Sequence, residues 1–120
     1  MVKLSTPRPV KAVMSIPTRN YNTVYQNTSG RPKLVIIGSY ITRATANTYV
    51  MAQVRVSTNS TPPDTDTVSE TGYGSSGPIQ NGTFVQTVMV PNNYYYMLVS
   101  YIQGGSGNLV QPDYWIEVEL

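Results

Sequence analysis

The residues that could do chemistry are few, and two acidic pairs are the first to consider. Glu117 and Glu119 are two positions apart, so on a β-strand both carboxylates lie on one face, about 6.8 Å apart. Paired carboxylates can act as acid and base in glycoside hydrolysis. Alternate acidic residues on a terminal strand also keep a sheet edge soluble, and we prefer this structural interpretation to a catalytic one.

The second acidic pair, Asp64 and Asp66 in Pro-Pro-Asp-Thr-Asp-Thr, resembles half of a calcium-binding loop. The glycine and the closing glutamate of an EF-hand loop are missing. The chain also has no cysteine and no histidine, which excludes disulfides, thiolate metal sites, histidine-based triads and the HExxH zinc motif. The sequence therefore predicts no enzyme activity, no bound metal and no cofactor.

Aromatic side chains are the next candidates, because ten tyrosines in 120 residues is a high number. A Tyr-Tyr-Tyr run on a strand sends its rings to alternate faces, so at least one ring is expected to be exposed. Exposed tyrosines beside Ser/Gly/Asn-rich loops provide contact area in antibody-like and sugar-binding surfaces, whereas the alternative role is cross-strand packing. The candidates for binding a partner, a host receptor or a glycan are Tyr73, Tyr94, Tyr95, Tyr96 and Trp115.

Four basic residues, Lys3, Arg8, Lys11 and Arg19, lie in the first nineteen positions and could bind an acidic partner. Phosphate binding is weakly supported, because the charges are spread out and no aromatic residue separates them within residues 1–20. Residues 1–20 also contain neither RNP-type aromatics nor a GXXG loop. A protein partner is therefore expected, and not a nucleic acid.

The charge is distributed unevenly along the chain. All eight basic residues precede all six acidic ones, although the net charge is only +2. Either the two halves interleave in the fold and pair their charges, or a basic end docks on an acidic partner or on the next subunit.

Length and composition indicate one small domain with a neutral surface. The 120 residues suffice for a single core, and 40% of them are hydrophobic. Only 12% are charged, against about 25% in an ordinary globular domain, so neutral polar residues must cover the surface. This surface is typical of secreted and virion β-proteins. The sequence contains no apolar run of membrane-spanning length and no secretory signal, so no membrane association is expected.

Residues 1–20 contain Pro7, Pro9 and Pro17 without hydrophobic periodicity, which predicts an extended N-terminal arm able to reach a neighbouring subunit. Short runs rich in Val, Ile, Tyr and Thr then alternate with turn residues, the pattern of a sandwich or barrel. No helix is expected. The predicted strands are 23–27, 33–41, 49–57, 83–90, 94–102 and 114–120.

Two of the predicted segments bear on function. The 33–41 strand contains Leu34-Val35-Ile36-Ile37, apolar on both faces, which indicates a central strand covered on one side by the core and on the other by a partner or an arm. Gly38 interrupts this strand and is a candidate β-bulge. Residues 58–82 are rich in Pro, Gly and Asp, so we expect a long loop there and take it as the first candidate for a contact surface.

The last predicted strand places Tyr114, Ile116, Val118 and Leu120 on one face. Trp115, Glu117 and Glu119 lie on the opposite face, which we expect to be the outer one. Together the elements predict an all-β fold, a single antiparallel β-sandwich of jelly-roll type at residues 21–120, preceded by the extended N-terminal arm at residues 1–20.

Three motifs occur in a familiar order: Tyr25-Gln-Asn-Thr-Ser-Gly-Arg-Pro32, Val90-Pro91-Asn-Asn-Tyr94-Tyr95 and the chain-ending Tyr114-Trp115-Ile-Glu-Val-Glu-Leu120. Their order resembles small β-sandwich domains of tailed bacteriophages, found as head decoration proteins and at the tips of tail fibres. The resemblance covers roughly residues 21–120, leaves out the arm, and differs at Asn92-Asn93, where Pro or Gly is expected. It implies a non-enzymatic, oligomeric virion component.

A capsid decoration or cement protein on the virion surface is the favoured interpretation, because the sequence shows no fibre shaft. Its partner would be the major capsid protein or another virion protein, contacted by the basic arm, and the chain would be a homo-oligomer. The alternatives are a receptor-binding tip of a tail fibre and a carbohydrate-binding module.

Overall fold

The computed structural model describes residues 12–74, 77–108 and 112–120. Within these ranges the chain forms β-strands and one short 3-10 turn, with no α-helix. The elements are β1 (Val13–Ser15), β2 (Tyr25–Gln26), β3 (Lys33–Arg43), β4 (Tyr49–Ser57), η1 (Asp64–Asp66), β5 (Thr67–Tyr73), β6 (Gln80–Val90), β7 (Tyr95–Gln103), β8 (Gly107–Asn108) and β9 (Pro112–Glu119).

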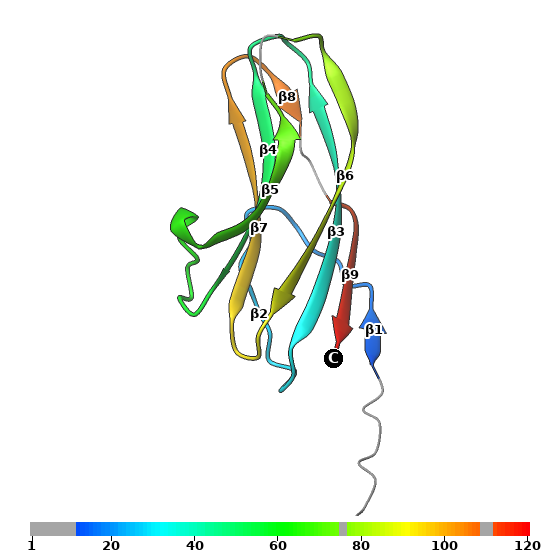
Figure 1. The fold of residues 1–120 in the computed structure, drawn as a ribbon, viewed down its shortest axis with the longest axis vertical. Helices are drawn as coiled ribbons and strands as arrows, with labels where there is room; N and C mark the ends of the chain where they lie inside the picture. The colour runs from blue at the N-terminus through cyan, green and yellow to red at the C-terminus, as the bar shows by residue number, and fades with distance from the viewer. Residues whose placement is uncertain (1–11, 75–76, 109–111) are drawn as a thin grey trace, which may run out of the picture.

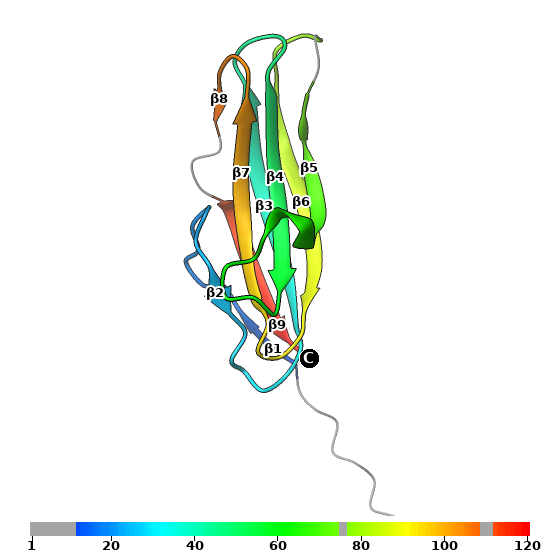
Figure 2. The same cartoon turned by 90° about the vertical axis from the view of Figure 1, so that its left-hand side faces the viewer.

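The strands form two sheets that pack face to face. One sheet has the order β1-β9-β3-β6, with the short β8 beside β3, and the other has the order β2-β7-β4-β5. All pairings are antiparallel. Figure 1 shows the two sheets side by side, and Figure 2 shows the β2-β7-β4-β5 sheet in front. With β8 set aside, this order of eight strands in two sheets is that of a jelly roll, which confirms the predicted fold class.

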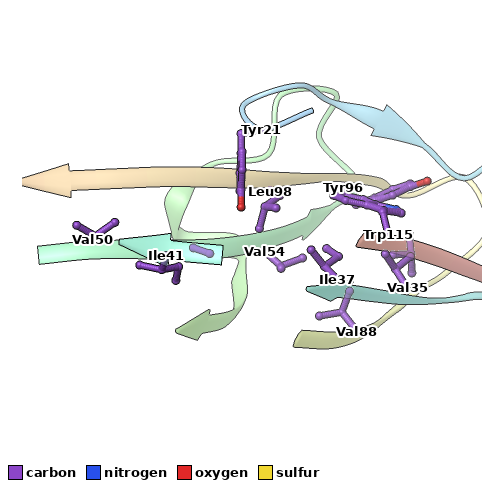
Figure 3. Close-up of a cluster of buried hydrophobic side chains, with 12 residues drawn as sticks. Tyr21, Val35, Ile37, Ile41, Val50, Val54, Val88, Tyr96, Leu98 and Trp115 are labelled. Atoms are coloured by element: carbon purple, nitrogen blue, oxygen red, sulfur yellow. The ribbon is translucent and has the colours of Figure 1, made fainter. Parts of the chain in front are cut away.

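The core lies between the sheets and is built from alternate residues of the long strands. Val35, Ile37 and Ile41 of β3 are fully buried and face Val54 and Leu98 of the opposite sheet (Figure 3). The period of two along each strand explains why every second residue enters the core. Burying one such aliphatic side chain stabilises the fold by about 1.5–3 kcal/mol.

A break in strand pairing is present at the predicted position, Gly38, but the extra residue of the bulge is Asp113 of β9 and not a residue of β3. The pairing of β3 with β9 shifts its register between Gly38 and Ser39, whereas β3 and β6 stay in register over their full lengths. The ring of Tyr114 lies against Gly38, where a Cβ atom would overlap it. A glycine is therefore required here so that the aromatic ring of β9 can lie flat across β3.

The prediction of one long loop at residues 58–82 is wrong. Thr67–Tyr73 form β5, the edge strand of the second sheet, paired along β4. The signal was hidden because the hydrophobic pattern is inverted: Val68 faces solvent, while Ser69 points inward and accepts a hydrogen bond from Gln86. The true loop before β5 carries η1 and projects from the outer side of its sheet (Figure 1).

The described part of the predicted arm lies on the sandwich. Residues 13–15 form β1, which pairs with β9 at the edge of its sheet. The chain then crosses to the second sheet, where the Asn22 amide donates to the Leu98 carbonyl at 2.7 Å and the Asn22 side chain bonds Ser100. Residues 12–24 are thus attached to their own domain, while the position of the boundary between arm and domain stays a prediction.

The assignment of faces on the last strand is wrong. Trp115 and Glu117 point into the sandwich and are only 3% and 1% exposed, while Tyr114 lies on the outside. The register explains this: Trp115 is opposite Ile37 and Glu117 is opposite Val35, both core residues of β3. Alternation favours the wrong face, because the buried face carries Trp115 together with two glutamates. Glu117 can be buried only because donors distant in the sequence bind its carboxylate.

Candidate functional site

The carboxylate of Glu117 is the centre of a buried polar cluster. Its oxygens accept hydrogen bonds from the Tyr96 hydroxyl at 2.6 Å and the Trp115 indole N–H at 2.9 Å. Lys33 Nζ lies 3.0 Å from Oε1, and the Arg19 guanidinium donates to both oxygens at 3.3 and 3.4 Å. The Glu117 cluster, defined as these five residues, therefore joins β3, β7, β9 and the N-terminal segment.

Arg19, a residue of the arm that is predicted to contact a partner, binds side chains of its own chain in the structure. Besides its ion pair with Glu117, its guanidinium lies over the Tyr25 ring, 4.1 Å from the ring centroid. Such a cation–π contact adds to the ion pair in holding the side chain. The other predicted arm contacts, Lys3, Arg8 and Lys11, lie outside the described residues.

Electrostatics keep the cluster in one protonation state. Burial raises the pKa of Glu117, but the hydrogen bonds from Tyr96, Trp115, Lys33 and Arg19 outweigh this and leave that pKa below its ordinary value. Burial also raises the pKa of Tyr96, and the adjacent carboxylate raises it further. Glu117 is thus ionised and Tyr96 protonated at neutral pH, an arrangement suited to holding structure and unsuited to proton transfer.

The predicted exposure of Tyr96 and Trp115 is wrong, since both rings are buried between the sheets (Figure 3). Their ring centroids are 6.4 Å apart, and the Tyr25 ring contacts both. Their hydroxyl and indole N–H groups are buried together with the carboxylate that they bind. Tyr96 therefore has the packing role that was the alternative to surface binding for the Tyr94–Tyr96 run.

The other predicted aromatic residues do not form one surface. Tyr73 lies opposite Val50 and packs edge-on against Phe84, with a centroid distance of 5.0 Å. Tyr95 lies opposite Ser57, so about 24 Å of β4 separates it from Tyr73 at about 3.4 Å per residue. Tyr73, Tyr94 and Tyr95 are half-buried. Their roles as contact residues stay predictions.

Residues 12–74, 77–108 and 112–120 form no pocket. These residues also contain no group of three or more acidic side chains that could hold a metal ion, and Asp64 with Asp66 does not make one. No helix in these ranges is long and apolar enough to span a membrane.

The outer face of the β1-β9-β3-β6 sheet is unusually apolar. Many outward positions of the four strands are apolar, and the register aligns Met14, Val118, Leu34 and Met89 in one cross-strand row. We call this the apolar sheet face, and its side chains are Met14, Leu34, Ile36, Tyr40, Val85, Met89, Tyr114, Ile116 and Val118.

The apolar sheet face carries no charge. The remaining outward positions of β3 and β6 are Gly38 and the neutral polar residues Thr42, Asn81, Thr83 and Thr87. The nearby cations Lys33 and Arg43 point to the other side of the sheet, where Lys33 binds Glu117 and Arg43 is buried. From the sequence, the Leu34–Ile37 run, apolar on both faces, predicts that something covers β3 on both sides, but it does not identify the residues of this face.

Comparison with known proteins gives only a distant likeness. No protein-family model matches the chain, and no curated protein matches it either. Among solved structures, the fold is similar to the subviral particle of infectious bursal disease virus VP2, with 10% sequence identity and a TM-score of 0.40. The alignment covers 98% of this chain and 37% of the VP2 chain.

Proposed function

We propose that the protein is a non-enzymatic structural component of a virion, and that it decorates the outer surface of the capsid and stabilises contacts between capsid subunits. The observation that supports this proposal best is that β1 is an exposed strand at the edge of its sheet. This three-residue strand ends its sheet, all its residues are exposed, and the following Ile16 is 72% exposed.

An edge strand of this kind is open to pairing with another chain. Natural proteins usually protect sheet edges with charges or by covering them, because unpaired N–H and C=O groups recruit further strands. Val13, Met14 and Ile16 instead leave apolar side chains at the edge, directly after the basic residues Lys3, Arg8 and Lys11. An acidic strand of a neighbouring capsid subunit would complement both features.

The Glu117 cluster provides a second argument for the same proposal. It fixes Arg19, three residues beyond Ile16, to Glu117 of β9. Force applied to the N-terminal segment by a capsid partner would therefore be transmitted to the core strands β3, β7 and β9. This is the mechanical connection that a cementing protein needs.

The test is binding to heads of the parent virus that lack the protein, followed by size-exclusion chromatography with light scattering. Removing residues 2–11 keeps β1 and Arg19, and should weaken co-elution with heads. Ile16→Asp in the full chain should also weaken co-elution, because it places a charge next to the edge strand β1. Val68→Asp, on the exposed side of β5, is the matched control. Head binding that survives both changes would reject the proposal.

A receptor-binding module is the second candidate, and a pair of exposed tyrosines favours it. Tyr49 and Tyr101 lie on adjacent strands β4 and β7, since Tyr49 is opposite Gln103 and Tyr101 is opposite Met51. Rings held this way offer stacking surfaces to a glycan or a host protein. Loss of host-cell binding by Tyr101→Ala or Tyr73→Ala, with head binding intact, would favour this candidate.

A further inference from the structure

The apolar sheet face is too apolar to be an ordinary solvent-facing surface. Antiparallel sheets with one free side usually alternate apolar residues inside with polar ones outside. Here β3 contributes Leu34, Ile36 and Tyr40 to the outside, in the same strand whose inward residues are fully buried. Contiguous exposed apolar patches larger than a few hundred Å² mark interaction sites on soluble proteins.

We propose that the apolar sheet face is the interface with a second copy of this chain, in a two-fold symmetric, face-to-face dimer. Two sheets would then pack at about 10 Å, as the sheets of a sandwich do. The inference does not depend on the capsid role, because self-association is a property of the chain alone.

Charge selects a second copy as the occupant. A two-fold interface places a surface against itself, so any charge near its centre meets a like charge. The outward positions of β3, β6 and β9 that pair in register carry no charge, and the exposed Asp113 is the unpaired residue of the β9 bulge, next to Tyr114. The acidic residues Asp64 and Asp66 belong to η1, which is not part of this sheet. The face is therefore complementary to itself and would bury no unpaired charge.

The size of the face fits a small dimer. The pairing of β3 with β6 extends over eleven residues of each strand, and β9 and β1 widen the sheet. At about 3.4 Å per residue and 4.8 Å between strands, the sheet plane covers roughly 500 Å², and projecting side chains raise the accessible area. Stable interfaces bury about 800 Å² per partner, so we expect association on the order of micromolar Kd.

The bulge at Gly38 shapes this face. Because Tyr114 lies across the glycine, its ring fills the position that a side chain of β3 would otherwise occupy. Val85 on β6 is opposite Gly38 on the other side of β3 and is 58% exposed. The ring and the valine thus extend the apolar surface across a strand that contributes no side chain there.

The experiment is sedimentation equilibrium of the full chain from low to high micromolar concentration, with Val85→Lys as the test and Val68→Lys as the control. Both valines are 58% exposed on strands, but Val68 is on β5 of the other sheet. In a two-fold dimer, Val85→Lys brings two lysines into the interface. Circular dichroism and thermal unfolding would verify that both variants fold.

We expect the wild-type chain and Val68→Lys to reach twice the 13.2 kDa mass of one chain, and Val85→Lys to raise Kd at least about tenfold. A wild-type chain that is monomeric at every concentration would overturn the inference. So would a dimer that Val85→Lys leaves unchanged, because another surface would then mediate it.

Other occupants of the face give different results. If removing residues 2–11 turned a monomer into a dimer, the chain's own N-terminal residues would be the occupant. If the wild type were monomeric and Val85→Lys lost head binding, the occupant would be a capsid subunit. Either result rejects the dimer. Dimerisation and head binding are measured separately, so one proposal can fail while the other stands.

Discussion

The two faces of the β1-β9-β3-β6 sheet are built from neighbouring residues of the same strands but have different surroundings. On the inner face, Val35 and Ile37 are fully buried against the second sheet. On the outer face, Leu34 and Ile36 are equally apolar, but no described residue belonging to the second sheet covers them. The comparison teaches that hydrophobicity alone does not define a core: a covering layer is also required, and here only one side has it within the chain.

The two faces also differ in charge. A buried face is expected to be neutral and an exposed face to be charged, but here the reverse is observed. The buried inner face contains the ionised Glu117, whereas the exposed outer face contains no charge. A buried carboxylate persists only when donors replace its water shell, and Tyr96, Trp115, Lys33 and Arg19 do so. The inner face is thus complete within one chain, while the outer face is not.

The largest expected effect is that of removing the carboxylate from the inner face. Glu117→Ala would leave Lys33 and Arg19 as unpaired charges and deprive two buried donors of their acceptor. We expect the free energy of unfolding to fall by about 3–5 kcal/mol, measured by urea denaturation. Glu119→Ala, two residues along the same strand and partly exposed, should change it by less than about 0.5 kcal/mol. Equal losses in the two variants would contradict the role of the cluster.

A pair of adjacent isoleucines tests the comparison of faces directly. Ile37→Ala opens a cavity in the core and should cost about 2–4 kcal/mol. Ile36→Ala removes the same atoms from the outer face and should cost less than about 1.5 kcal/mol at concentrations where the chain is monomeric. Thermal or chemical unfolding at low concentration measures both. Similar costs would mean that the outer face is covered within the monomer.

Much of the fold could be predicted from the sequence, for identifiable reasons. The strand at Tyr49–Ser57 has the predicted bounds because its alternation is regular and turn residues border it. A glycine inside an apolar strand predicts the break in pairing at Gly38, although the extra residue of the bulge lies in β9. β5 is not predicted by the sequence, because it is an edge strand whose inward residues include the polar Ser69 and Thr71, with only Tyr73 at its end packed against the core.

The site was harder to predict, because it depends on contacts between distant residues. Arg19 and Glu117 are 98 positions apart, and only the jelly-roll order brings the N-terminal segment to the last strand. The sequence predicts Trp115 and Glu117 on an exposed face. An indole N–H two residues from a carboxylate is equally typical of a buried donor bound to its acceptor, and this is what the structure shows. Apolar residues on both sides of β3 did indicate a second covered face, but sequence alone could not show what covers it.

A smaller effect is expected from releasing the N-terminal segment from the inner face. Arg19→Ala removes one of the two ion pairs of Glu117 and the contact with the Tyr25 ring, while Lys33 remains bound. We expect a loss of about 1–2 kcal/mol in the free energy of unfolding, together with faster cleavage after the first residues in limited proteolysis. Arg19→Lys should restore part of both, because a lysine keeps the charge but not the forked geometry. No change in the cleavage rate would show that β1 alone holds the segment.

The smallest effect concerns acid, and its sign follows from the lowered pKa of Glu117. A carboxyl group whose pKa is lower in the folded than in the unfolded chain stabilises the fold above the unfolded value and loses that contribution as the pH falls through the folded value. Because the unfolded value is about 4.3, this group should leave stability unchanged from neutral pH to about pH 5 and reduce it only below. Glu117→Gln lacks the titrating group, so the stability difference between wild type and Glu117→Gln, measured in urea at each pH, should shrink as the solution is acidified below that range. A difference that stays constant in acid would mean that the charge of Glu117 is not what its donors stabilise, and the contrast between a charged inner face and a neutral outer face would lose its energetic basis.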